Sequence, residues 1–461
     1  MNASSYAKPL TMALLLLLSA CGGGSSSTGD SSSSALNLVD WTWIGGSDSF
    51  GQPGNYGNKG ITVSTNMPQA LEGAMSWTDT STNHNLWLFG GGGGTGPTDF
   101  SDMWKYDGAN WTWMNGPTPA GTFNQQNVSG ALGYPAARQY SATWVKSNGA
   151  GSNLWLFGGY VRIDYAGTTA NANDLWRYDT NNNQWSLISG TAASEQPGIY
   201  GTASDYPGAR WGAASWVDLT GNFWLFGGSG LDYASNKGYL NDLWKFDGTN
   251  WTWVSGANIV DEPGTYNTPG TIVPGARSGA VSWIDNSGSL WLFGGIGYDS
   301  AGSFGNLNDL WKFDGTNWTW LKGSSFIDRS GSYGTPGNPS PNNTPGARRF
   351  AISWKDGNGN FWLFGGSGYD SAGNLGTLND LWKFDGANWT WMSGSNITDQ
   401  IGEYGTTGNS DPAKFVPGSR DVAVSWYDTI NSRFLLFGGQ GFDAYGSNGY
   451  LNDLWKFQPK P

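Results

Sequence analysis

The chain has very little cysteine, histidine or charge. Cys21 is the single cysteine and His84 the single histidine among 461 residues. An intrachain disulfide is therefore excluded, and so is a metal site built from two histidines. Charged residues make up only 13% of the chain, and the formal net charge is −12. Sequence-independent nucleic-acid binding depends on clustered lysine and arginine, so this composition argues against a nucleic-acid partner.

Apolar stretches are short as well, and one of them lies near the N-terminus. It covers residues 10–18 after Lys8, too few to cross a bilayer as a helix, and it has the layout of a secretory signal. Leu18-Ser19-Ala20-Cys21 follows and resembles the bacterial lipobox, whose cysteine becomes lipid-modified. We therefore expect a lipoprotein signal peptide at residues 1–20 and lipidation of Cys21.

The segment that follows the signal contains almost only small and polar residues. Residues 21–35 are rich in glycine and serine, which predicts a flexible tether with a reach of about 20 Å. Gly22, directly after the cysteine, resembles the pattern that directs lipoproteins to the outer membrane of Gram-negative bacteria. We therefore expect residues 36–461 to form a domain held by its lipid anchor close to the membrane of a bacterial envelope.

What the chain has in abundance is glycine, with 73 residues, and aromatic side chains, at 15%. A segment of the form Leu-Trp-Leu-Phe-Gly-Gly recurs, and each copy precedes a variant of Asn-Asp-Leu-Trp-Lys-Phe-Asp. A unit this short cannot bury its own apolar face, so neighbouring units must cover it, and the repeat sets the fold. The six copies lie at residues 86–91, 154–159, 223–228, 290–295, 361–366 and 434–439.

The third repeat shows how one unit becomes a sheet. Residues 210–217 and 222–228 read as two apolar strands, which we name A and B. Residues 241–247 alternate with a period of two and predict strand C, and residues 251–254 predict strand D. Asp247-Gly248 between C and D suits a hairpin turn. Four antiparallel strands with periodic glycine and aromatic residues are typical of a propeller blade.

These residues resemble the kelch repeat, which has an arginine-led first strand, a second strand ending in Gly-Gly and a tryptophan in the fourth. The resemblance covers residues 41–458 and implies an all-β, six-bladed β-propeller of four-stranded blades. The sixth repeat stops after strand C, and the missing strand D occurs at the N-terminus, in residues 41–45. We expect this strand to complete the last blade and remove a free sheet edge.

One rim of the propeller carries the insertions. The Gly-Gly pairs recur about every 70 residues, whereas a kelch unit has roughly 50. The excess lies mainly in the loops from strand D to the next strand A, and insertions on one rim usually mark a binding face. Strand alternation places the D–A and B–C loops on the same rim. Because the tether enters a D strand from the other rim, we expect this rim to face away from the membrane.

Each D–A loop carries an aromatic residue. It has two possible roles: to anchor the long loop onto the adjacent blade, or to join a ring of exposed aromatics that stack on sugar or peptide. The six residues are Tyr56, Phe123, Tyr200, Tyr266, Tyr333 and Tyr404.

Arginine opens strand A in five repeats, and Leu71 takes this place in the first. Residues here contribute to the ligand face of kelch proteins that bind peptides, so the resemblance implies a ring of guanidinium groups able to hold carboxylate or phosphate. The alternative is that each arginine pairs with a nearby repeated carboxylate, such as Asp232 or Asp242 in the third repeat. The five residues are Arg138, Arg210, Arg277, Arg348 and Arg420.

We predict a binding or scaffold module that meets a protein, peptide or glycan at the D–A/B–C rim, without cofactor or metal. The aspartate-rich loops lack the spacing of a calcium loop. The alternative is a carbohydrate-modifying enzyme such as a metal-free sugar epimerase or mutarotase, since another bacterial kelch family acts on sialic acid without metal. An enzyme predicts one odd, carboxylate-lined pocket at the least regular repeats, the first and second, where Leu71 replaces arginine.

Overall fold

The computed structural model describes residues 39–93, 98–118, 133–163, 168–191, 195–267, 272–409 and 415–459. Contacts within the chain define a compact unit, Asn37–Pro461. Its described residues form β-strands joined by turns. None of them forms a helix with the length and apolarity that a membrane span requires. The predicted lipidation site Cys21 and the loop residue Phe123 lie outside the described residues.

The two central strands of each repeat are B and C. The B strands carry the Phe-Gly-Gly segments and are β4 (Leu86–Phe89) with β5 (Gly92–Gly93), β11 (Gly151–Arg162), β16 (Phe223–Leu231), β21 (Leu290–Tyr298), β26 (Phe361–Tyr369) and β31 (Arg433–Phe442). The C strands are β6 (Thr98–Asp99) with β7 (Met103–Tyr106), β12 (Thr169–Asp179), β17 (Lys237–Phe246), β22 (Phe304–Phe313), β27 (Leu375–Phe384) and β32 (Asn448–Pro459).

Strands A and D flank this central pair. The D strands are β8 (Trp111–Asn115), β13 (Gln184–Ser189), β18 (Trp251–Ser255), β23 (Trp318–Lys322), β28 (Trp389–Ser393) and β1 (Val39–Gly45). Strand A is in two pieces. The first pieces are β2 (Leu71–Glu72), β9 (Arg138–Gln139), β14 (Arg210–Trp211), β19 (Arg277–Ser278), β24 (Arg348–Arg349) and β29 (Arg420–Asp421). The second pieces are β3 (Met75–Thr78), β10 (Ala142–Asn148), β15 (Ala214–Val217), β20 (Val281–Ile284), β25 (Ile352–Lys355) and β30 (Val424–Asp428).

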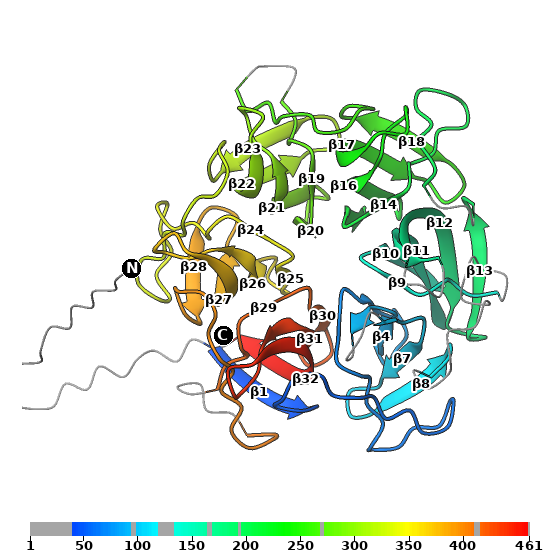
Figure 1. Ribbon diagram of the computed structural model, residues 1–461, viewed down its shortest axis with the longest axis vertical. Coiled ribbons are helices and arrows are strands. Elements are labelled where there is room, and N and C mark those ends of the chain that lie inside the picture. The colour runs from blue at the N-terminus through cyan, green and yellow to red at the C-terminus, as the bar shows by residue number, and fades with distance from the viewer. Residues whose placement is uncertain are drawn as a thin grey trace, which may run out of the picture. The chain divides into compact units, whose positions relative to one another are not determined.

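The sheets are antiparallel and follow the predicted order A-B-C-D. In the third repeat, β14 and β15 both pair with β16, which pairs with β17, and β17 pairs with β18. The first repeat is split into a sheet β3-β4-β7-β8 and a smaller sheet β2-β5-β6. The sheets lie around a common axis with the A strands innermost (Figure 1). This arrangement confirms the prediction of an all-β, multi-bladed β-propeller.

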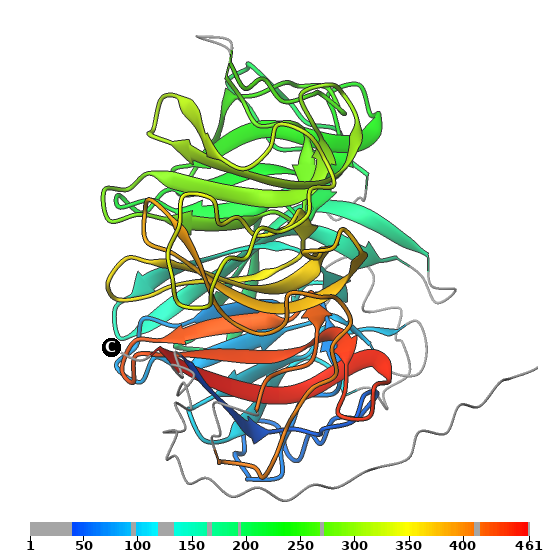
Figure 2. The same cartoon turned by 90° about the vertical axis from the view of Figure 1, so that its left-hand side faces the viewer.

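The N-terminal strand closes the ring as predicted. β1 pairs antiparallel with β32, with Trp41 opposite Phe457 and Trp43 opposite Trp455. Both views show the blue β1 beside the red β32 (Figures 1 and 2). The Trp41 ring packs on Phe364 and Phe457, each with a centroid distance of 5.2 Å. The two ends of the described chain therefore share one sheet and one aromatic cluster.

The apolar core lies between neighbouring repeats. Six clusters of buried residues are present among the described residues, and each combines side chains from two successive repeats, including the last and the first. In one cluster, Phe226 of the third repeat packs on Trp318 of the fourth, with a centroid distance of 5.3 Å. This confirms that each unit depends on its neighbour for cover.

A closed ring of backbone hydrogen bonds surrounds the axis. Each of six equivalent residues donates its N–H to the carbonyl of its counterpart in the preceding repeat, and the first repeat donates to the sixth, with N···O distances of 2.8–3.1 Å. All six have positive φ, between 48° and 65°. We call these residues the axial ring: Gly73, Tyr140, Gly212, Gly279, Phe350 and Val422.

The axial ring explains why strand A is not the continuous strand predicted for residues 210–217. The left-handed conformation of Gly212 turns its N–H away from strand B toward Tyr140 of the second repeat. Strand A therefore stops at Trp211 and resumes at Ala214.

Candidate functional site

The arginines that open strand A are inside the protein. Both terminal nitrogens of Arg210 bind Asp242 on strand C, with Nη1–Oδ1 at 2.6 Å and Nη2–Oδ2 at 2.7 Å. Nη1 and Nε also donate to the carbonyls of Gly227 and Gly208. Arg210 and Asp242 are both buried. Four of the five N–H groups of Arg210 are therefore engaged, and burial closes the pair to a ligand.

The same arrangement occurs in all five repeats that have the arginine. The shortest N–O distance is 2.6–2.7 Å in every pair. The alternative carboxylate Asp232 instead accepts hydrogen bonds from its own turn, at Ala234 and Asn236. The pairs are Arg138–Asp174, Arg210–Asp242, Arg277–Asp309, Arg348–Asp380 and Arg420–Asp453.

The loop tyrosines complete these clusters. The Tyr200 hydroxyl donates to Asp242 Oδ2 at 2.8 Å, and its ring lies 4.9 Å from the ring of Trp244. The indole N–H of Trp244 donates to the same carboxylate oxygen at 2.6 Å. Burial, with the charge of Asp242 second, raises the pKa of Tyr200. Tyr56, Tyr266, Tyr333 and Tyr404 make the corresponding hydrogen bond in their own repeats.

These positions correct the expected ligand face. Arg138, Arg210, Arg277, Arg348 and Arg420 are at most 1% exposed, so they do not form an open guanidinium ring. Tyr56, Tyr266, Tyr333 and Tyr404 are buried and Tyr200 is partly buried, so each fixes its long loop to strand C rather than presenting a stacking surface. The placement fits the alternatives of structural pairing and loop anchoring. Phe123 cannot be placed, because it lies outside the described residues.

The first repeat keeps the carboxylate but has no arginine. Asp102 is 2% exposed and receives hydrogen bonds from the Tyr56 hydroxyl, from Gln69 Nε2 at 3.4 Å and from Trp104 Nε1 at 2.7 Å. Leu71 fills the equivalent position of the arginine. Burial raises the pKa of Asp102, and the hydrogen bond from Tyr56 is the largest of the opposing effects.

The residue after each arginine is different in every repeat. Successive residues of a strand point to opposite faces. Because the arginine side chain points into the blade, toward strand C, the next side chain points toward the axis at the D–A/B–C rim. We call these six residues the mouth residues: Glu72, Gln139, Trp211, Ser278, Arg349 and Asp421.

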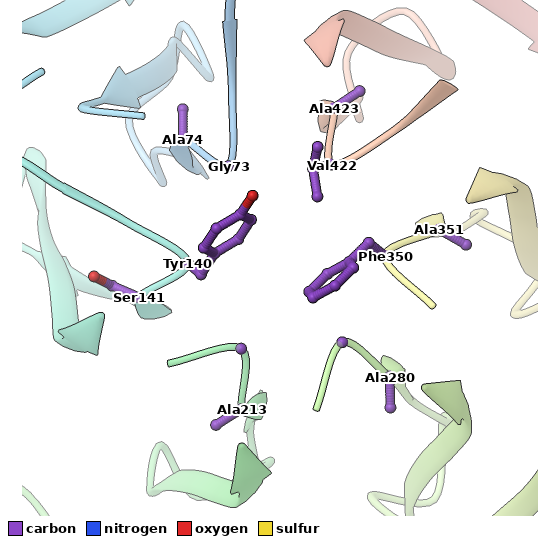
Figure 3. A pocket seen from close by; sticks show the side chains of 12 residues that line it. Gly73, Ala74, Tyr140, Ser141, Ala213, Ala280, Phe350, Ala351, Val422 and Ala423 are labelled. Carbon is purple, nitrogen blue, oxygen red and sulfur yellow. The ribbon is translucent and has the colours of Figure 1, made fainter. Parts of the chain in front are cut away.

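Three aromatic rings meet where the mouth residues border the axial ring. Tyr140 and Phe350 extend toward the axis from opposite sides (Figure 3), with ring centroids 5.5 Å apart. Trp211 lies 5.4 Å from Tyr140 and stacks on Phe350 at 6.3 Å. A pocket of about 180 Å³ lies at the axis, lined by the axial ring and by the next residue of each repeat. All three rings are half-buried.

Two glycines make room for the aromatic rings. A Cβ on Gly73 would lie 2.7 Å from the Tyr140 ring, and a Cβ on Gly279 would lie 2.7 Å from the Phe350 ring. Each ring therefore covers the glycine of the preceding repeat.

Carboxyl groups collect on one side of the mouth. Burial first, then the charge of Asp421, raises the pKa of Glu72 to about 7, and the nearby Tyr140 hydroxyl opposes this rise. Burial raises the pKa of Asp421 to about 6 despite the nearby charge of Arg349. Burial also raises the pKa of Asp99, which receives a hydrogen bond from Gln139. The three carboxyl groups come from the first and sixth repeats, and their partners Tyr140, Gln139 and Arg349 come from the second and fifth.

Sequence reasoning missed this group because it followed what the repeats share. The repeated arginine, aspartate, tyrosine and tryptophan maintain the fold. The available signal was divergence: six different residues directly follow a position that is arginine in five repeats. No group of three or more metal-ligating side chains lies together in the part of the chain that the structure describes.

The sheets, their closure and the axial ring define a β-propeller. No protein-family model matches the chain. Over 200 residues it is 27% identical to Kelch domain-containing protein 3 of Bos taurus and 28% identical to that of Mus musculus. Each match covers 42% of this chain and 42% of the relative, so the chain spans less than half the length of the curated relatives it matches.

A solved structure described as "Structure of YjhT" has a TM-score of 0.48 and 15% sequence identity. The match covers 87% of this chain and 95% of that one. The sheets and their closure make the chain a β-propeller, and its sequence is similar to the Kelch domain-containing proteins over part of its length.

Proposed function

We propose that this protein is a binding module whose ligand sits at the D–A/B–C end of the propeller axis. The observation that carries the proposal is the divergence of the mouth residues. Elsewhere, one cluster of arginine, aspartate and tryptophan is repeated five times with nearly the same distances. A repeated cluster serves every repeat equally, whereas recognition of one ligand needs one asymmetric surface.

The mouth has the chemistry of a recognition surface. Tyr140, Trp211 and Phe350 offer half-buried ring faces, and the polar mouth residues Glu72 and Arg349 directly precede two residues of the axial ring. Aromatic faces with a few polar groups at their border suit a sugar ring or a peptide side chain. The long D–A loops on this rim, fixed by their tyrosines, supply further surface for a protein, peptide or glycan.

An array of glycans and peptides probed with the full chain tests this proposal. Phe350→Gly removes one ring and keeps the left-handed backbone, because three repeats already have glycine at this position. We expect it to weaken binding of the captured ligand at least tenfold. Leu219→Ala is the matched control, since Leu219 is 71% exposed in an A–B turn of the other rim. Equal loss in both variants, or no loss in Phe350→Gly, contradicts the proposal.

A second candidate function is acid–base catalysis on a carbohydrate, such as epimerisation or mutarotation. It is favoured by two neighbouring carboxyl groups, Glu72 and Asp421, whose pKa values of about 7 and about 6 suit proton transfer near neutral pH. The Tyr140 hydroxyl beside Glu72 is a third proton-bearing group. Proton NMR of reducing sugars incubated with the chain and with Glu72→Gln tests it. Equal anomer exchange in the two samples removes this candidate.

We also propose that Cys21 anchors the module to the bacterial envelope, at the outer membrane. The support is the lipobox-like end of the signal and Gly22 after it. In a Gram-negative host, Cys21→Ser is expected to move the protein from the membrane fraction to the soluble fraction. Unchanged fractionation contradicts the anchor.

A further inference from the structure

The charges at the mouth are unequal in number. Asp421 interacts with Arg349, and Asp99 interacts with Arg162. Among the described residues, Asp421, Asp99 and the hydroxyls of Tyr140 and Tyr450 interact with Glu72, and none of these groups is a cation. Asp421 Oδ1 also accepts no hydrogen bond from the described residues. On this side of the mouth, carboxyl groups therefore outnumber cations, and hydrogen-bond acceptors outnumber donors.

Aromatic rings stand next to Glu72, the carboxyl group without a neighbouring cation among the described residues. The Tyr140 ring covers Gly73, the residue after Glu72, and it packs against the rings of Trp211 and Phe350. The faces of tyrosine and tryptophan rings attract cations, and they also cover aliphatic carbon. A carboxylate beside ring faces is the combination that suits a cation carried on a carbon chain or ring.

We propose that the mouth binds a primary ammonium group, with Glu72 as its counterion and the rings of Tyr140, Trp211 and Phe350 as the surface for its carbon skeleton. The inference rests on the proposed function, since it names the ligand chemistry for the same site. An ammonium group carries three donors and no acceptor, which matches the surplus of oxygen acceptors. The group can come from a lysine side chain or from an amino sugar.

An anionic ligand fits this site less well. Arg349, which directly precedes Phe350, is the one cation among the mouth residues, and its charge acts on Asp421 and on Tyr239. An anion would have to compete with Asp421 for Arg349 and would also face Glu72 and Asp99. Like charges at close range in a half-buried site are costly.

Isothermal titration of the full chain at pH 8 tests the inference. The probes are Nα-acetyl-lysine methylamide and D-glucosamine, with Nα-acetyl-norleucine methylamide and N-acetyl-D-glucosamine as their neutral counterparts. We expect at least one amine to bind at least tenfold more tightly than its neutral counterpart, and the better amine identifies the source. Glu72→Gln, which keeps the shape of the side chain, should remove this preference, and Phe350→Gly should weaken binding of the amine.

Glu262→Gln is the control, because Glu262 lies in a D–A loop and is not one of the mouth residues, so it should not alter the preference. Equal binding of amines and neutral counterparts overturns the inference, as does a preference that survives Glu72→Gln or the absence of any binding by the four probes. Ligands from the array that need Phe350 but carry no amine would leave the proposed function standing while this inference fails.

Discussion

A single charge distinguishes the first repeat from the other five. In the third repeat Asp242 neutralises Arg210, whereas the side-chain donors to the buried Asp102 among the described residues are a neutral hydroxyl, amide and indole. A buried ion pair adds modest net stability, but removal of one partner leaves an uncompensated charge in the interior. The two aspartates should therefore respond differently to the same substitution.

We expect Asp242→Asn to lower the free energy of unfolding by about 3–5 kcal/mol, because Arg210 loses its counterion. Asp102→Asn should cost less than about 2 kcal/mol, because the amide keeps an acceptor for Trp104 and no arginine is left unpaired. Denaturant unfolding of both variants at pH 7 measures the difference. Similar losses in the two variants would contradict the role assigned to the arginine pairs.

The burial of the arginines also shows where sequence reasoning reached its limit. Their pairing with a repeated carboxylate was open as an alternative, and five copies of one spacing favoured it. The sequence did not settle which way strand A faces near the rim, because the pieces before the axial ring have only two residues each. A shift of one residue in that orientation exchanges Arg210 for Trp211 at the mouth.

At the scale of whole strands, β1 is the element on which closure depends. It pairs along β32 from Val39 to Gly45, and without it the C strand of the last repeat would present an open edge. The closure could be predicted because the last repeat lacks a strand that the N-terminus supplies. The break in strand A could not, because three of the six residues at the break are Tyr140, Phe350 and Val422, which rarely adopt positive φ.

Deletion of residues 1–46 is expected to produce oligomers or aggregates, because the edge of β32 becomes available to other chains. Deletion of residues 1–38 is the control, since it leaves β1 complete. Size-exclusion chromatography with light scattering distinguishes the outcomes. Two deletions that are equally monomeric and equally stable would show that β1 is dispensable for closure.

For the whole molecule, the acidic side of the mouth affects the pH dependence of stability. The pKa of Glu72 is about 7 and that of Asp421 about 6 in the folded protein, both above the ordinary values of 4.5 and 3.8. Between about pH 4.5 and pH 7 the unfolded chain has lost protons that the folded chain keeps, so stability decreases as the pH rises. The stabilising contribution of these two protonated groups is complete below about pH 4 and is lost above about pH 7.

Glu72→Gln should reduce the loss of stability between pH 5 and pH 8 by roughly 1–2 kcal/mol, since glutamine does not ionise. Thermal unfolding at both pH values measures this loss, with Glu262→Gln as the control. An unchanged difference between the two pH values would show that ionisation of Glu72 does not oppose folding.

The axial ring has a mechanical consequence for recognition. Its six peptide groups form one continuous loop of hydrogen bonds, so the aperture cannot dilate for a larger guest unless several of these bonds break together. Adjustment is left to the side chains that stand on the loop. Exchange of glycine and bulky residues at these six sites would thus change the width of the opening while the backbone ring keeps its diameter.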